Sequence, residues 1–228
     1  MASDPAAALT AGPLAPTELA LLHGERFTTA QVLLGATGDP QVMLLHADVH
    51  VSARQLGQAL LQIAFLANDQ ARAIRLEPRP KKKLFGLSST DALFADPGGQ
   101  NVSWPAGSLE SRIRPLVDRL AADGDNDVQS IIAALVERSA EPWALVSGLV
   151  AEGLGSRGLL QQAPMVEPDL FPQSRWTLPE DTRRMAADQK IGPVEQLLGD
   201  CERDRPELWQ RLNDQIEQAI EQQTDSSR

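Results

Sequence analysis

Apolar residues recur at helical spacing along most of this chain. The clearest run follows Ser52, whose side chain suits the cap of a helix, and continues until polar residues begin at Asn68. Its apolar members lie one to four positions apart, on one side of a helix: Leu56, Ala59, Leu60, Ile63, Ala64 and Ala67. A second run follows Pro206, a residue suited to the first turn of a helix, and consists of Leu208, Leu212, Ile216 and Ile220. Both runs predict amphipathic helices.

Weaker stripes of the same period predict helices at residues 18–22, 108–120, 127–138, 143–154, 180–187 and 193–198. Alternating or short apolar runs, typical of strands, occupy residues 41–45, 73–77, 84–94, 158–161 and 174–178. Two passages share the order helix, strand, loop, strand, with loops at residues 78–83 and 164–172; prolines bracket the first loop. The predicted fold class is mainly α with small β-hairpins: a compact helical domain with winged-helix-like units and about half of its residues in helices.

The length of 228 residues suits a single domain. The composition predicts a flexible leader at residues 1–16, one helical domain at 17–222 and a disordered tail at 223–228. No segment has the pattern of a signal peptide or the roughly 18 to 20 apolar residues of a membrane span. The single cysteine, Cys201, allows no internal disulfide. We therefore expect a cytoplasmic protein whose contact with any membrane is peripheral.

One basic segment stands out against an acidic composition. The formal net charge is -10 at pH 7, which disfavours indiscriminate nucleic-acid binding. Residues 71–90 nevertheless hold six basic side chains against one acid, Glu77. The six basic residues and the two apolar residues that follow them are Arg72, Arg75, Arg79, Lys81, Lys82, Lys83, Leu84 and Phe85. We predict that this segment contacts an anionic partner.

The basic segment has two interpretations. Cations beside apolar side chains are typical of a loop that rests on an anionic bilayer, with Leu84 and Phe85 in the interface. Lysines also keep an ordinary hairpin soluble, and Leu84 and Phe85 then pack inward. Only the first interpretation gives the segment a binding function.

No motif predicts catalysis, a cofactor or a metal. His46 and His50 have the spacing of two ligands on a helix, with Asp48 between them, but they lie in a strand-like stretch without a third ligand. Residues 35–40 contain two glycines but lack the Lys-Ser/Thr of a phosphate-binding loop. Acidic neighbours are expected to raise the pKa of Cys201, which disfavours a nucleophile. Core or subsurface anchoring is predicted for most of the four tryptophans, Trp104, Trp143, Trp176 and Trp209.

Two segments carry a resemblance to a known family. Residues 60–64 (Leu-Leu-Gln-Ile-Ala) and 73–77 (Ala-Ile-Arg-Leu-Glu) precede the basic hairpin, and a Trp-led helix ends in Ser-Arg-Gly-Leu-Leu at residues 156–160. The last motif is similar to Val-Glu-Lys/Arg-Gly-Val-Leu of the Golgi phosphoprotein 3 family. The chain resembles that family over most of residues 50–222.

The resemblance implies a mostly α-helical, peripheral membrane protein. In eukaryotes the family reads phosphatidylinositol 4-phosphate and binds glycosyltransferase tails. The pocket arginines of the eukaryotic members fall at Ala144 and Ser147, and a further arginine falls near Gln58, with Arg54 one turn away. The resemblance therefore implies a general role at anionic surfaces and not specific headgroup recognition.

Three functions stay open on this basis. The first is a non-enzymatic adaptor that docks on an anionic membrane through the basic hairpin. The second is a winged-helix nucleic-acid binder that uses the same loop as a wing, although the helices before both hairpins are poor in Lys and Arg. The third is a protein-interaction module or homo-oligomer subunit that uses its acidic helical surface and the stripe at residues 208–220. We favour the first.

Overall fold

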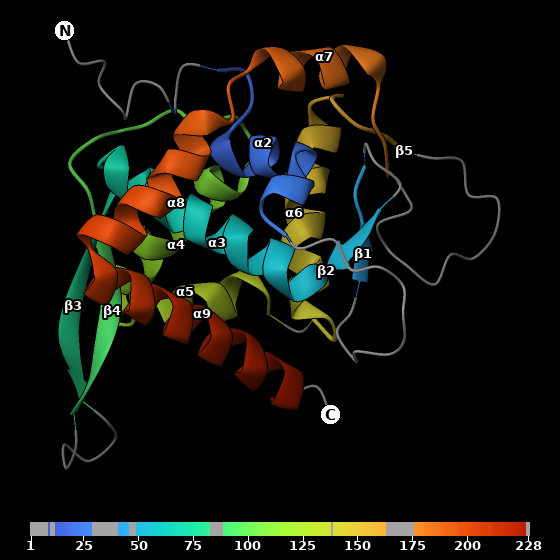
Figure 1. The fold of residues 1–228 in the computed structure, drawn as a ribbon. Coiled ribbons are helices and arrows are strands. Elements are labelled where there is room, and N and C mark those ends of the chain that lie inside the picture. Colours follow the sequence, from blue (N-terminus) through green and yellow to red (C-terminus); the bar gives the residue numbers. More distant parts are fainter. Residues whose placement is uncertain are drawn as a thin grey trace, which may run out of the picture.

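The structure, a computed structural model, describes residues 9, 12–28, 41–45, 49–82, 89–137, 139–162 and 176–226. Within this part of the chain, 61% of the residues are helical. The described residues form eight α-helices and three two-stranded antiparallel sheets. The predicted fold class, mainly α with small β-hairpins, is therefore confirmed. Figure 1 shows the other helices arranged around α3, with the β3–β4 hairpin at one side.

The elements occur in the following order. Those of the first half are α2 (Pro16–Leu22), η1 (Gly24–Arg26), β1 (Gln41–Met43), β2 (His50–Ser52), α3 (Ala53–Gln70), β3 (Ile74–Lys82) and β4 (Ser89–Pro97). Those of the second half are α4 (Leu109–Asp123), α5 (Val128–Leu135), α6 (Pro142–Ser156), β5 (Gln161–Gln162), β6 (Trp176–Thr177), α7 (Glu180–Asp188), α8 (Gly192–Asp204) and α9 (Pro206–Ser226). Both predicted passages of helix followed by hairpin are present, as α3–β3–β4 and α6–β5–β6.

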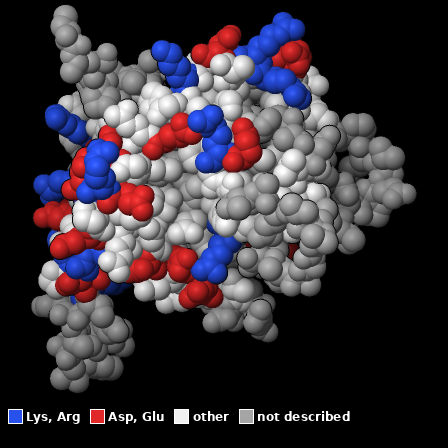
Figure 2. Space-filling view, viewed as in Figure 1, with Lys and Arg blue, Asp and Glu red and all other residues white. Residues whose placement is uncertain are grey.

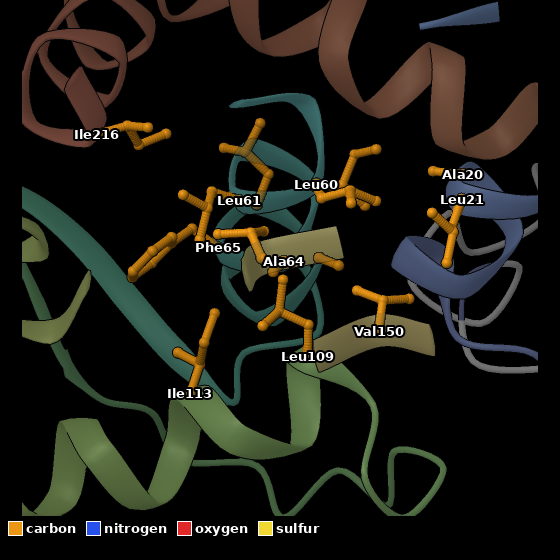
Figure 3. Packing of buried hydrophobic residues seen from close by; sticks show 14 of the residues in the cluster. Ala20, Leu21, Leu60, Leu61, Ala64, Phe65, Leu109, Ile113, Val150 and Ile216 are labelled. Carbon is orange, nitrogen blue, oxygen red and sulfur yellow. The ribbon is translucent and has the colours of Figure 1, made fainter. Parts of the chain in front are cut away.

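Helix α3 forms the centre of the core. Its cap is the predicted one, because Ser52 Oγ accepts a hydrogen bond from Gln55 N at 3.2 Å. Thirteen of its 18 residues are buried, so other elements enclose it on nearly all sides. Figure 3 shows Leu61 on the side of Ile216 in α9 and Leu60 on the side of α2. Contacts in all directions make α3 the element against which the others pack.

The predicted stripe of the last helix is part of this core. Leu212 and Ile216 are fully buried, and α9 packs against α5 and α3. The stripe is therefore not available as an interaction surface, and that part of the third hypothesis is wrong.

The predicted loop at residues 78–83 is also wrong, because β3 continues through Pro78 and Pro80 to Lys82. Leu76 of β3 and Ala95 of β4 are opposite each other in the register. Their N–H groups do not bind the partner strand, because Leu76 N donates to Asp69 Oδ1 and Ala95 N donates to Asn126 O. The backbone N–H groups of this pair therefore point outward from the hairpin. Pro78 and Pro80 lie two and four positions further along β3, so their backbone nitrogens also point outward. Because proline lacks an N–H group only on this outer side, no hydrogen bond between the two strands is lost. The returning strand β4 extends past its predicted end at residue 94, and residues 83–88 lie outside the described residues.

Several boundaries differ from the prediction. Leu14 and Ala15, assigned to the leader, are buried, and α9 extends beyond residue 222. Helix α8 is longer than predicted because Leu197 and Cys201 continue its buried face by another turn. Helix α5 is shorter and ends at Leu135. The second hairpin has only two residues in each strand.

Candidate functional site

The β3–β4 hairpin carries the predicted site. Each strand has nine residues, and the register runs from Ile74 opposite Pro97 to Lys82 opposite Ser89. At about 3.3 Å per residue this gives a ribbon about 30 Å long. Figure 1 shows that its Lys82–Ser89 end points away from the helices.

The eight predicted site residues are distributed along this ribbon. Arg75, Arg79 and Lys81 lie on one face of β3, because side chains two positions apart share a face. Arg72 lies before β3, exposed, with a left-handed φ of 58°. Lys82 is the last residue of β3. The other three, Lys83, Leu84 and Phe85, lie outside the described residues.

Acidic side chains accompany the three cations on this face. Arg79 donates to Asp96 Oδ1 at 2.7 Å, and its guanidinium lies 4.4 Å from the ring centroid of Phe94. Arg75 lies 3.4 Å from Asp96 Oδ2 and 3.3 Å from Glu77.

The third cation, Lys81, lies 2.5 Å from Asp127 Oδ2. Two of the three acids, Asp96 and Asp127, lie outside the window 71–90 in the sequence. The local charge excess seen there is therefore not present on this face of the folded hairpin. Figure 2 shows basic and acidic side chains next to each other on this side of the molecule.

The turn between α4 and α5 holds the hairpin. Asn126 O accepts from Ala95 N at 2.9 Å, and Asn126 Nδ2 donates to Ala95 O and Asp96 Oδ1. Asp127 is fully buried and caps α5 by accepting from Ser130 N at 3.2 Å. Burial disfavours the charged form of Asp96, but hydrogen bonds from Arg79 and Asn126 hold its pKa below the usual value. The carboxylate that pairs with Lys81 is therefore the same one that caps α5.

An apolar cavity of about 180 Å³ lies at the opposite end of α3. Its walls come from α2, β1, α3, α6 and β6, with contributions from residues beside them: Leu21, Met43, Leu45, Leu56, Ser139, Glu141, Ala144, Leu145, Ser147, Gly148, Ala151 and Trp176. None of these described lining residues is Lys or Arg. Met43 is partly exposed, which continues the apolar surface outside the cavity.

The cavity is lined by Ala144 and Ser147, the two positions at which the predicted resemblance places arginines of the eukaryotic pocket. Ser147 Oγ donates to Ala144 O at 2.9 Å, within α6. The walls therefore suit an apolar group and not a phosphate. Sequence reasoning missed this cavity, because its residues come from distant segments and Trp176 was predicted only as an anchor.

Other candidate chemistry finds little support. Among the described residues, no group of three or more His, Cys, Asp or Glu is placed to hold a metal. Of the predicted histidine pair, His50 is in β2, whereas His46 and Asp48 lie outside the described residues, as do residues 35–40. Cys201 is buried, and its burial raises the pKa of its thiol. The carboxylate that adds to this shift is Asp69 of α3, so the predicted cause, the acidic neighbours in the sequence, is wrong.

Of the helices that the structure describes, none has the length and apolarity to cross a membrane. Comparison with protein-family models, with curated proteins and with solved structures finds no match to this chain. The resemblance to the Golgi phosphoprotein 3 family therefore stays a prediction.

Proposed function

We propose that the protein is a non-enzymatic adaptor that docks on an anionic lipid surface through the far end of the β3–β4 hairpin. The observation that supports this most is the course of β3, which continues through Lys81 to Lys82 at an end of the ribbon that points away from the helices (Figure 1). A contact at that end does not require the acidic body to approach the lipid.

Three cations of the hairpin are engaged in ion pairs. Arg75, Arg79 and Lys81 have acidic partners within the protein. The proposal assigns the lipid contact to the residues that follow these three in the sequence, Lys82 and Lys83 together with Leu84 and Phe85. Each lysine contributes about 1 kcal/mol near an anionic leaflet, and each apolar side chain about 1.5–3 kcal/mol if fully buried. After the cost of association, one copy binds weakly and reversibly.

The edges of the hairpin disfavour binding by strand addition. On β3, Leu76 N–H is bound to Asp69, and Pro78 and Pro80 have no N–H group. On β4, Ala95 N–H is bound to Asn126. A partner strand therefore finds few donors along the edge of β3, and one of the outward donors of β4 is already bound.

The charge pairing also weakens the nucleic-acid alternative. A wing that binds nucleic acid uses its cations on phosphates. The cations on the described face of β3 already have carboxylate partners.

The docking proposal is tested by vesicle co-sedimentation of the wild type and of Lys82→Glu/Lys83→Glu, with and without an anionic lipid. We expect the wild type to bind only the anionic vesicles and the variant to bind at least about 10-fold more weakly. The matched control is Arg183→Glu/Arg184→Glu, which changes the charge equally on the exposed face of α7. Equal binding to neutral vesicles, or equal losses in both variants, contradicts the proposal.

A second surface suits the partner side of such an adaptor. The apolar cavity lies at the other end of α3 from the hairpin, and its size suits an apolar side chain of a partner protein. This observation favours the protein-interaction hypothesis as a complement to docking.

The cavity is tested by filling it. A Cβ at Gly148 meets no atom within 4 Å, so Gly148→Leu fills the cavity without a backbone clash. We expect this variant to lose most binding of the uncharged dye N-phenyl-1-naphthylamine, measured by fluorescence, and to keep vesicle binding. Gly199→Leu, in equally open space on α8, is the control and should bind the dye as the wild type does. Unchanged dye binding by Gly148→Leu rejects the cavity as the site.

A further inference from the structure

A buried carboxyl group joins α2 to α4. Glu110, in the first turn of α4, is fully buried. Both of its carboxyl oxygens bind one residue of α2: Thr17 N donates to Oε1 at 2.8 Å, and Thr17 Oγ1 lies 2.7 Å from Oε2. A second residue, Asn68 of α3, donates to the backbone carbonyl of Glu110 at 3.2 Å. The carboxyl group is therefore the polar link between the two helices.

A second buried carboxyl group lies beside the first. Glu18 of α2 is fully buried, accepts a hydrogen bond from Ala15 N at 2.9 Å and forms an ion pair with Arg157, the residue after α6. Of the charged groups that the structure places around this junction, Arg157 is the cation, and it is bound to Glu18. Two carboxyl groups thus share one positive charge.

The two arginines of α4 that follow Glu110 most closely have partners elsewhere. Arg112 of α4 pairs with Glu152 of α6 at 3.1 Å, and Arg114 pairs with Asp118 on the same helix. On the side of β4 and α5, Asp96 pairs with Arg75 and Arg79, and Asp127 with Lys81. From α3 the junction receives only the neutral Asn68.

This arrangement favours a proton on Glu110. Burial raises the pKa of Glu110 to about 7, and the charge of Glu18 contributes to the shift. Burial also raises the pKa of Glu18. In the protonated state, Glu110 donates its proton to Thr17 Oγ1 and still accepts from Thr17 N. In the ionised state, a second negative charge is buried without a cation of its own.

We infer that Glu110 is a proton-sensitive link: while its carboxyl group is protonated α2 is held firmly on α4, and when the proton is lost α2 opens more readily from the body. All seven residues of α2 are buried, and its main contacts are with α3 and α6. Because Leu21 of α2 lines the apolar cavity, opening of α2 removes one wall of that cavity.

The direction of the effect follows from proton linkage. The carboxyl group takes its ordinary pKa when α2 is open, near 4.5. The closed state therefore binds more protons than the open state between pH 4.5 and about 7. Opening is least favourable below pH 4.5, becomes up to about 10-fold more favourable per pH unit in this window, and changes little above it.

The test is native-state amide hydrogen exchange of the full chain between pH 5 and 8.5, corrected for the intrinsic exchange rate. We expect the opening constant of α2, read from the amides of residues 17–22, to rise at least about 30-fold from pH 5 to pH 7 and then to level off. The buried residues of α9 serve as the internal reference for global unfolding. Global unfolding also frees Glu110, so α9 should show a similar rise, but from a much smaller opening constant than that of α2. A flat profile for α2, or an opening constant of α2 equal to that of α9 at every pH, overturns the inference.

Two variants locate the effect. Glu110→Gln keeps both hydrogen bonds to Thr17 but does not titrate, so the rise should shrink markedly; any residual slope is assigned to Glu18 by Glu18→Gln. Thr17→Val weakens the link at every pH and should keep the slope, which provides a readout if Glu110→Gln folds poorly. The exposed Glu152→Gln is the control and should behave as the wild type. An unchanged slope in Glu110→Gln contradicts the assignment.

Discussion

At the scale of single residues, two glycines of α6 have different surroundings. A Cβ at Gly153 would lie 2.8 Å from the carbonyl carbon of Gly107, and closer still to its oxygen. A Cβ at Gly148 has open space around it. The first glycine is required for close packing of α6 against the start of α4, whereas the second has no such requirement.

We therefore expect opposite results from one kind of substitution. Gly153→Ala should lower the free energy of unfolding by about 1–3 kcal/mol, because backbone atoms have to move apart. Gly148→Ala should raise it by about 0.5–1 kcal/mol, because alanine is the better helix former. Urea denaturation measures both, and a stabilised Gly153→Ala would contradict the packing described here.

Residue-level signals also explain what the sequence predicts well. The caps at Ser52 and Ser108 act on backbone groups three residues away, so local sequence is enough to find these helix starts. The partners of Lys81 and Trp104 are Asp127 and Asn68, 46 and 36 positions away. The charge balance of the hairpin could not be predicted, because it depends on such distant contacts.

At the scale of elements, the β3–β4 hairpin shows how register decides the meaning of a proline. Pro78 and Pro80 predict a loop when read locally, since proline lacks a donor. In the register of the hairpin, the backbone nitrogens of both prolines point away from β4, so the strand continues through them. Only knowledge of the pairing partner distinguishes these outcomes.

The same prolines should keep the hairpin from pairing with a second copy. Pro78→Val/Pro80→Val restores two N–H groups on the outer edge of β3, and we expect concentration-dependent dimers in size-exclusion chromatography with light scattering. Glu77→Val also adds an apolar side chain, but the backbone N–H group of residue 77 points toward β4, so no donor is added to the outer edge. This control variant should elute as the wild type does. Identical behaviour of both variants would contradict a role for the edge donors.

At the scale of the whole molecule, stability should depend on pH through two groups of opposite sign. Glu110 has a raised pKa, so its contribution is complete below pH 4.5 and is lost as pH rises through about 7. Asp96 has a lowered pKa, so its contribution is present above its ordinary pKa of 3.8 and is lost as pH falls. Stability should therefore be greatest in mildly acid solution.

The Glu110 contribution is large enough to measure. The difference between 4.5 and about 7, at about 1.4 kcal/mol per unit, corresponds to about 3 kcal/mol. We expect urea midpoints of the wild type to fall from pH 5 to pH 8 and those of Glu110→Gln to fall much less. A wild type that becomes more stable over this range would contradict the sign.

The candidate surfaces differ in how far the sequence reveals them. The basic hairpin is continuous in the chain, so its composition is enough to identify it. The cavity combines Leu21, Leu56, Ala144 and Trp176, which come together only when the fold is complete. Periodicity identifies each of these residues as apolar, but it does not indicate that they leave a space between them.

The central position of α3 has a mechanical consequence. Leu56 lines the cavity and Asp69 binds the hairpin, and the helix between them spans about 20 Å. A buried helix of this kind does not bend easily, and the ribbon of the hairpin extends the span further. A protein segment bound in the cavity would therefore remain at a fixed distance from a surface that Lys82 contacts. The molecule would act as a rigid spacer between its two binding partners.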